Sequence, residues 1–195
     1  MSHAHNHTIH RHHHHFGWDQ ANEPVLRIAP GETVEFEIID ASGGQFGPGS
    51  VAADVALLNF DKVNPVTGPV YIDGAEPGDS LKITLDSFRP SGWGWTANIP
   101  GFGLLADRFT DPAIINWQYD PDTLAPAVWN DLARIPLKPF TGTIGVAPAE
   151  VGVHSVVPPR RIGGNMDVRD LSAGSELYLP VEVAGALFSV GDTHA

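Results

Sequence analysis

The residues best suited to chemistry lie at the end of the chain, where Asp192 and His194 stand two positions apart. On an extended backbone, side chains at i and i+2 point to the same side of the strand. A carboxylate and an imidazole brought together in this way suit a divalent metal ion such as zinc. Spacing alone leaves a second interpretation open, in which the pair belongs to a solvated chain end.

A second polar pair, Asn165 and Asp167, follows two glycines at positions 163 and 164. Glycines without a side chain let the backbone approach another group closely, and Asn165 and Asp167 again have the spacing to share one face. The other interpretation is a turn between strands that is rich in Asn and Asp. Both interpretations place these side chains at the end of an element.

Histidines are concentrated at the start of the chain, where eight of the ten lie within the first fifteen residues. We expect residues 1–10 to form a flexible His-rich arm, either a plain polar arm or a metal-scavenging one. A flexible arm holds no fixed coordination geometry. Large aromatic residues follow at Phe16 and Trp18, so residues 11–195 are expected to form one folded domain.

Several familiar kinds of active site are disfavoured. The chain has no cysteine, which excludes disulfides, thiolate metal sites and a cysteine nucleophile. It has no G-x-S-x-G motif, no P-loop and no strand-linked G-x-G-x-x-G. His154 is the only histidine in its segment of the sequence, and we expect it to have a structural role. Arg160 and Arg161 are neighbours in the sequence, and they either pair with internal carboxylates or form a subunit contact.

The charge balance and the short apolar runs limit which classes of partner and which cellular compartment we expect. With 11 basic and 23 acidic residues, the 195-residue chain has a formal net charge of −12, which argues against binding to nucleic acid. Apolar runs are too short for a helix that spans a bilayer, and the N-terminus lacks the features of a secretory signal. We therefore expect a soluble cytoplasmic protein without a membrane partner.

The elements that position these residues are expected to be short strands. The chain holds 21 glycines and 17 prolines, a density that long helices do not tolerate. A tight turn followed by alternating apolar and polar residues occurs three times, and it predicts half-buried strands over residues 33–38, 80–85 and 176–181. The third of these contains Pro180, so it is expected at a sheet edge or at a bulge. Further strands are expected over residues 25–28, 69–72, 143–147 and 186–190.

Two stretches depart from this pattern. Residues 52–60 predict a short helix. Residues 91–137 read as a long, loop-rich excursion that carries four tryptophans, including Trp93 and Trp95. Such an excursion either packs over one face of the sheets or forms the wall of a pocket.

Taken in order, several segments resemble the acetamidase/formamidase family. The similarity runs from about residue 8 to the last residue, and several ordered motifs at consistent spacing make it specific. The segments that carry it are Phe16-Gly17-Trp18-Asp19, Glu23-Pro24-Val25-Leu26, Asp40-Ala41-Ser42-Gly43-Gly44-Gln45, Pro65-Val66-Thr67-Gly68-Pro69-Val70-Tyr71, Gly142-Thr143-Ile144-Gly145-Val146-Ala147-Pro148, Gly163-Gly164-Asn165-Met166-Asp167, Leu179-Pro180-Val181 and Gly185-Ala186-Leu187-Phe188-Ser189-Val190-Gly191-Asp192-Thr193-His194-Ala195.

The resemblance implies an all-β fold, an antiparallel β-sandwich of jelly-roll type with long loops and few short helices. It also implies an oligomer that hydrolyses a small amide, formamide or acetamide, with a divalent metal ion in the site; zinc is favoured, with calcium or another divalent ion as the alternative. Asp192 and His194 match the family's G-D-x-H-A motif and are carried over as metal ligands, and Asn165 and Asp167 match its G-N-x-D motif. A histidine near the F-x-W element is a further ligand candidate, and His13 or His15 is favoured.

The proposed mechanism assigns roles to five side chains. Asn165 is expected to donate a hydrogen bond to the oxyanion, and Asp167 to orient or bind the metal. Glu150 is the candidate for moving the proton to departing ammonia, and Trp93 and Trp95 are expected to close a small substrate pocket.

One departure from the family pattern concerns the end of the chain. In the family, the G-D-x-H-A motif continues into a glycine/acid segment, G-D-G-E, whereas this sequence ends at Ala195. We therefore expect the N-terminal portion, about two-thirds, of a family member. It would act as an amidohydrolase, or would be an incomplete sandwich that pairs with a second chain bearing the missing C-terminal half. The terminal strand is expected to lack a neighbour and to expose an edge.

Overall fold

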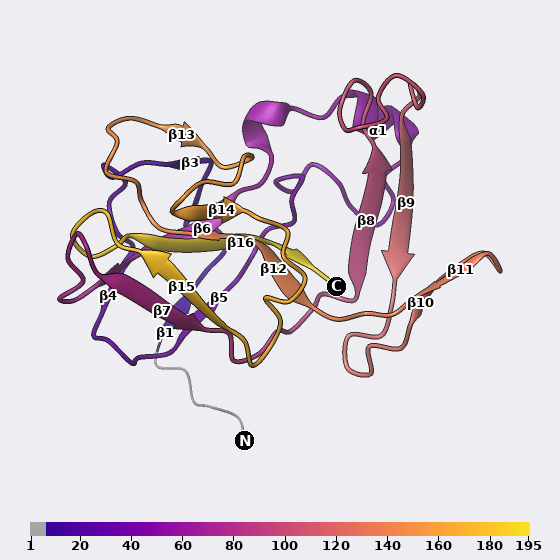
Figure 1. The fold of residues 1–195 in the computed structure, drawn as a ribbon. Helices are drawn as coiled ribbons and strands as arrows, with labels where there is room; N and C mark the ends of the chain where they lie inside the picture. The colour runs from indigo at the N-terminus through magenta and orange to yellow at the C-terminus, as the bar shows by residue number, and fades with distance from the viewer. Residues whose placement is uncertain (1–6) are drawn as a thin grey trace.

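The structure is a computed structural model that describes residues 7–195, and its regular elements are almost all β-strands (Figure 1). Within this range, the helical segments are one α-helix, α1 (Ala52–Ala56), and one 3-10 turn, η1 (Phe60–Lys62). α1 lies within residues 52–60, where the sequence predicts a short helix, and η1 begins at the last of these residues. The predicted all-β class is confirmed.

The larger layer is a six-stranded sheet in the order β14-β12-β16-β6-β2, with β4 also paired to β6. Its central strand is β16, which is antiparallel to β12 on one side and to β6 on the other. The strands are β2 (His14–His15), β4 (Leu26–Ile28), β6 (Val66–Ile72), β12 (Phe140–Gly145), β14 (Gly163–Asn165) and β16 (Phe188–His194).

Two separate pairs of strands face this sheet. One is β1 (His7–Ile9) with β5 (Val34–Phe36), and the other is β15 (Glu176–Pro180) with β7 (Ser80–Thr84). Three of these strands are the ones that the repeated turn-and-alternation pattern predicts. The strand that contains Pro180 lies at an edge, as expected, because β15 pairs only with β7 among the described strands.

The hydrophobic core lies between the two layers. Val66 and Ile144 of the larger sheet are fully buried in it, and Trp18 at the end of β3 (Gly17–Trp18) is 1% exposed. From the opposite layer, Phe36 packs edge-on against Phe188 with ring centroids 5.7 Å apart. Alternation along each strand turns one apolar face inward, which is why short strands suffice to build a sandwich.

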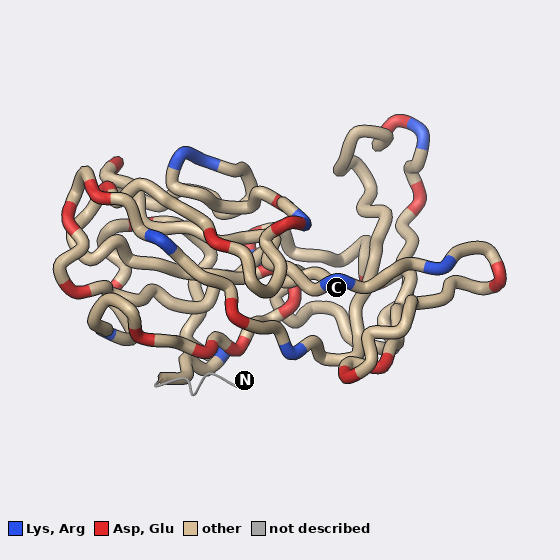
Figure 2. Tube along the Cα trace, turned by 60° about the horizontal axis from the view of Figure 1, so that its bottom comes forward, with Lys and Arg blue, Asp and Glu red and all other residues tan. Residues whose placement is uncertain are grey.

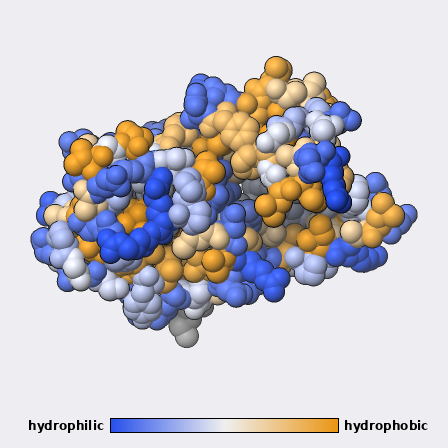
Figure 3. Space-filling model, turned by 45° about the horizontal axis from the view of Figure 1, so that its top comes forward, coloured by the Kyte–Doolittle hydropathy of each residue, from blue (hydrophilic) through white to orange (hydrophobic). Residues whose placement is uncertain are grey.

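Residues 91–137 form two hairpins rather than the loop-rich excursion that the sequence suggests. The first joins β8 (Trp93–Asn98) to β9 (Ala113–Gln118), and the second joins β10 (Ala127–Trp129) to β11 (Ala133–Ile135). Both stand beside the sandwich in Figure 1. Apolar side chains gather on the surface over the first hairpin (Figure 3), where the loop between its strands exposes Phe102, Leu104, Leu105 and Phe109.

Three further expectations differ from the structure. The sheets are not wholly antiparallel, because β1 runs parallel to β5 and β4 runs parallel to β6. The arm expected over residues 1–10 falls partly outside the described residues, and its last part forms strand β1, which buries Ile9. The terminal strand exposes no edge, because β16 lies between β12 and β6 at the centre of its sheet.

The surface charge follows the composition. Acidic residues are spread over the strand connections and outnumber Lys and Arg in the view of Figure 2. Within residues 7–195, none of the helices is long and apolar enough to cross a membrane.

Candidate metal centre

Three side chains from two distant parts of the chain meet at the end of strand β16. His194 Nε2 lies 3.4 Å from an oxygen of Asp192 and 3.4 Å from an oxygen of Asp167. Asp192 and His194 belong to β16, whereas Asp167 follows β14, the strand at the far side of β12. Each residue offers one ligand atom, and the three atoms all lie within 4.8 Å of one another.

These separations suit a small divalent cation. Two ligand atoms held at zinc distances by a tetrahedral ion lie about 3.3–3.4 Å apart. Both separations measured from His194 Nε2 are 3.4 Å. Two carboxylates and one imidazole also form a donor set that zinc and related metals accept, with positions left open for water or substrate.

Gly142 on strand β12 forms the floor of this cluster. A Cβ atom placed on Gly142 would come within 2.7 Å of both Asp167 Oδ1 and His194 Nε2. The same residue also fixes Asp167, because the Gly142 carbonyl accepts hydrogen bonds from the backbone N–H groups of Met166 and Asp167. The absence of a side chain at position 142 is therefore a condition for the three ligand atoms to meet.

The two aspartates have an unusual backbone conformation. Asp167 has φ 51° and Asp192 has φ 48°, in the left-handed region that few residues other than glycine occupy. Such conformations are most often retained where the surrounding structure needs a side chain in a particular direction. At Asp192 the left-handed backbone interrupts the plain alternation of β16, so the convergence of Asp192 and His194 depends on more than strand periodicity.

Buried polar groups hold Asp192 in place. Asp192 is 6% exposed, and its Oδ2 lies 3.4 Å from the hydroxyl of Thr143 and 3.5 Å from the side-chain amide of Asn64. The Thr143 hydroxyl also lies 2.9 Å from Asn165 Oδ1. The Thr143 hydroxyl has one hydrogen to donate, and the shorter of its two contacts is the one to Asn165. Thr143 thus lies between the two motifs that the sequence singles out.

When no cation is bound, the surroundings of the cluster favour the protonated forms of His194 and Asp167. The pKa of His194 is raised, chiefly because its ring hydrogen-bonds to Asp192. The pKa of Asp167 is raised as well, first by burial and then by the charge of Asp192. The Asp192 carboxylate contributes to both shifts, and a bound cation would neutralise its charge. His194 also stacks on Phe140, with ring centroids 4.7 Å apart.

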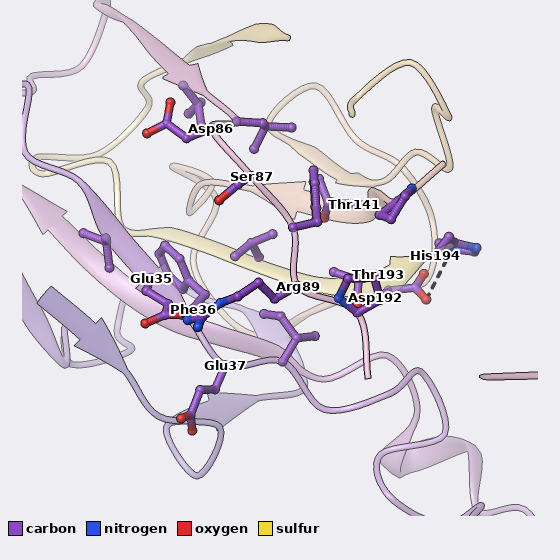
Figure 4. A pocket seen from close by; sticks show the side chains of 18 of the residues that line it. Glu35, Phe36, Glu37, Asp86, Ser87, Arg89, Thr141, Asp192, Thr193 and His194 are labelled. Carbon is purple, nitrogen blue, oxygen red and sulfur yellow. Dashed lines mark ion pairs between the residues drawn. The ribbon is translucent and has the colours of Figure 1, made fainter. Parts of the chain in front are cut away.

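The cluster opens into a large cavity, and the two predicted pocket tryptophans line that cavity. Trp93 and Trp95 line the same space of about 2500 Å³ as Asp192 and His194. Figure 4 shows Asp192 and His194 at one end of this space. Trp95 is fixed by a hydrogen bond from its indole N–H to Asp40, 3.0 Å long. The cavity is much larger than a pocket that would fit formamide or acetamide alone.

The predicted histidine ligands lie elsewhere. His15 Nδ1 is 2.8 Å from the Gly17 carbonyl and its Nε2 is 2.9 Å from the Ser189 hydroxyl. Since a carbonyl only accepts, Nδ1 carries the hydrogen and the unprotonated Nε2 accepts from Ser189; burial lowers the pKa of His15 accordingly. His13 packs against His12, with ring centroids 4.1 Å apart. Neither His13 nor His15 belongs to the cluster of Asp167, Asp192 and His194.

Glu150 and the arginine pair also lie away from the cluster. Glu150 lines a separate cavity of about 270 Å³ together with His154, Arg160 and Arg161. Arg161 forms an ion pair with Glu182, 2.5 Å long, so one of the two arginines has the internal carboxylate that the sequence left open.

Sequence reasoning missed Gly142, Thr143 and Asn64. A sequence signal exists for the first two, because glycine and threonine fill four of the six positions of the buried strand β12, which leaves little room there for large apolar side chains. Asn64 gives no such signal, since its contact with Asp192 joins residues 128 positions apart.

The fold and the site define a β-sandwich protein with a candidate metal centre of carboxylates and an imidazole at the end of a strand. Comparison with known proteins then gives the family. The sequence model of the acetamidase/formamidase family matches residues 2–154 and 149–195. The chain therefore belongs to the acetamidase/formamidase family.

Comparisons with individual relatives support the same family. The chain is 27% identical to a formamidase from Methylophilus methylotrophus over 92% of its own length, and 28% identical to an acetamidase from Mycolicibacterium smegmatis over 92%. The crystal structure of an acetamidase from Bacillus halodurans matches 96% of the chain with a TM-score of 0.87 and 33% identity. The chain spans 57% and 59% of the two curated relatives and 62% of the Bacillus halodurans chain.

Proposed function

We propose that Asp167, Asp192 and His194 hold a divalent metal ion, zinc in the first instance, and that this centre hydrolyses a short-chain linear amide such as formamide or acetamide. The observation that carries the proposal is the meeting of three ligand atoms within 4.8 Å over Gly142, where a side chain would fill the space. The names of the relatives, formamidase and acetamidase, supply the substrate class.

The reaction adds water to the amide carbon, breaks the C–N bond and moves one proton from water to the departing nitrogen, giving a carboxylic acid and ammonia. A divalent ion in the cluster would supply Lewis-acid polarisation of the carbonyl and would lower the pKa of water. The three side chains would hold that ion in a fixed place, with the Thr143 hydroxyl 3.4 Å from Asp192 beside it.

To Asn165 we assign the stabilisation of the negative charge that develops on the carbonyl oxygen. Its Oδ1 accepts the Thr143 hydroxyl at 2.9 Å, so its Nδ2 hydrogens are left to donate to the substrate. One donor aimed at the developing oxyanion contributes about 10²–10³ in rate in other acyl-transfer enzymes. This is also the role expected of Asn165 from the sequence.

Asp167 is the carboxyl that we assign to the movement of the proton. It is the more exposed of the two aspartates in the cluster. A carboxylate has two oxygens, so one can hold the ion while the other takes up and releases the proton. Glu150, which the sequence suggested for this role, lines the separate cavity with Arg161.

Ammonia release from formamide and acetamide tests the proposal. The protein is stripped of metal, reloaded with zinc or another divalent ion, and compared with the same protein carrying His194→Ala. His154→Ala is the matched control, since His154 lies in the separate cavity. Metal-dependent release that His194→Ala abolishes and His154→Ala retains supports the proposal, and release that ignores both metal and His194 overturns it.

A further inference from the structure

The layer that faces the six-stranded sheet is divided in two. β5 pairs with β1, and β7 pairs with β15, but β5 and β7 do not pair with each other. Among the strands of residues 7–195, each of these two strands therefore has one edge without a partner. Unpaired strand edges present backbone donors and acceptors that another strand can use.

Both strands border one cavity, the same space of about 2500 Å³ that reaches the metal cluster. Every residue of β5 and β7 lines it, and the apolar side chains among them are only partly covered: Val34, Phe36, Leu81 and Ile83. Figure 4 shows β5 and the segment after β7 on either side of this space, with the Arg89 side chain lying between them. Arg89 forms an ion pair with Glu35 of β5.

An open space of this size inside a sandwich is unusual. Protein interiors are close-packed, and exposed apolar surface between two layers marks a place where another segment binds. Since the apolar faces of β5 and β7 already point toward the larger sheet, a strand placed between them would continue the same layer. Its apolar side chains would complete the core, and its backbone would pair on one or both sides.

The charges around the cavity indicate the composition of that strand. Arg11, Lys82 and Arg89 are the only lysines and arginines among its described lining residues, and acidic residues outnumber them. Lys82 pairs with Glu176 and Arg89 pairs with Glu35, so neither adds a net positive charge. A segment with alternating apolar and basic residues fits this lining best.

The relatives indicate where such a segment comes from. The chain spans 62% of the acetamidase from Bacillus halodurans, so that protein carries further polypeptide which this chain does not match. We propose that a segment of this kind, from the part of the family's length that residues 1–195 do not match, inserts between β5 and β7 as a β-strand. This mode of recognition is β-strand addition, in which main-chain hydrogen bonds give affinity and alternate side chains give specificity. The inference does not use the proposed hydrolysis.

Association and hydrogen exchange test it. The probe is the part of Bacillus halodurans acetamidase outside its match with this chain, co-expressed with residues 1–195. We expect a one-to-one complex in which the amides of residues 33–38 and 80–85 exchange at least about tenfold more slowly than in the chain alone, while those of β12 and β16 are unchanged. No complex, or a complex without this protection, overturns the inference. So does a homodimer of the chain that protects the same amides, because a second copy would then be the occupant.

Variants in the cavity sharpen the test. Ile83→Lys should abolish the complex, whereas Tyr178→Lys, at an exposed position on the neighbouring strand, should leave it intact. If Ile83→Lys fails to fold, Glu37→Lys replaces it, because that side chain is about half exposed and lines the same cavity. Glu37→Lys should weaken the complex about tenfold or more through like-charge repulsion with a basic strand. Unchanged affinity in a folded cavity variant counts against insertion at this place.

Discussion

Addition of a divalent metal ion should raise the unfolding temperature of this chain, and the size of the rise follows from the geometry. The ligand atoms of Asp167, Asp192 and His194 already lie within 4.8 Å of one another, so metal binding needs little rearrangement of the fold. A ligand that binds only the folded state at a free concentration one hundred times its Kd stabilises that state by about 2.7 kcal/mol. For a chain of this size, each kcal/mol raises Tm by about 2–4 °C, so the expected rise is about 5–11 °C.

The assay is calorimetry with and without zinc, in a variant whose histidines at 12, 13 and 14 are glutamines. That background removes most of the described histidine run as a competing metal site. His194→Ala in this background should lose the rise in Tm, and His154→Ala should keep it. An equal rise in the His194→Ala protein, or no rise with any divalent ion, would refute the reasoning from the cluster.

Three further predictions concern the surroundings of the cluster. Gly142→Ala should reduce metal affinity below detection by titration calorimetry, because its Cβ would lie 2.7 Å from two ligand atoms. Thr143→Val keeps the shape of the side chain but loses the hydroxyl near Asp192, and it should weaken metal binding about 10–100-fold in the same assay. In the metal-free protein, the raised pKa of His194 means that the folded state holds this proton more tightly than the unfolded state does. Stability should therefore be greatest below the unfolded pKa of about 6.5 and fall as pH rises through the higher folded pKa, measured by urea unfolding across that range.

Each of these predictions has a matched control. Gly94→Ala adds the same methyl group where nothing lies within 4 Å, so it should leave metal affinity unchanged. Thr96→Val makes the same substitution as Thr143→Val in strand β8, which contributes no member of the cluster. His194→Gln should flatten the pH dependence above pH 6.5. Equal loss of affinity in a variant and its control, or a pH dependence that persists in His194→Gln, would contradict the corresponding prediction.

Local patterns in the sequence predict much of the sandwich. Turns with glycine followed by alternating residues predict β5, β7 and β15, because both the turn and the buried face are encoded within about eight residues. The same patterns do not show which strands pair. β1 is hidden in a histidine-rich segment, yet Ile9 is buried and the strand pairs with β5, 27 residues away along the chain.

The residues of the candidate site can be predicted from the sequence, but the way in which they come together in space cannot. Asp192, His194 and Asp167 are visible as short polar motifs, whereas their meeting depends on β14 and β16 flanking β12 in the sheet. Glu150 shows the limit of the method, because a carboxylate near a site in sequence lies in another cavity in space. The left-handed backbone at Asp192 is also a tertiary effect that strand periodicity does not predict.

The candidate metal centre borders the open cavity between β5 and β7. Metal binding and catalysis depend on different parts of this arrangement. The ligands Asp192 and His194 come from β16, whose two edges are both paired, so the chain holds the cluster without outside help. Hydrolysis also needs a small site from which bulk water is excluded, since charge stabilisation is much stronger in such a site. The cavity of about 2500 Å³ is larger than such a site, so a segment that covers the space between β5 and β7 should raise the rate of hydrolysis above that of the chain alone. We therefore expect metal affinity to depend on residues 7–195 and the shape of the substrate pocket to depend on the strand proposed to fill the divided layer.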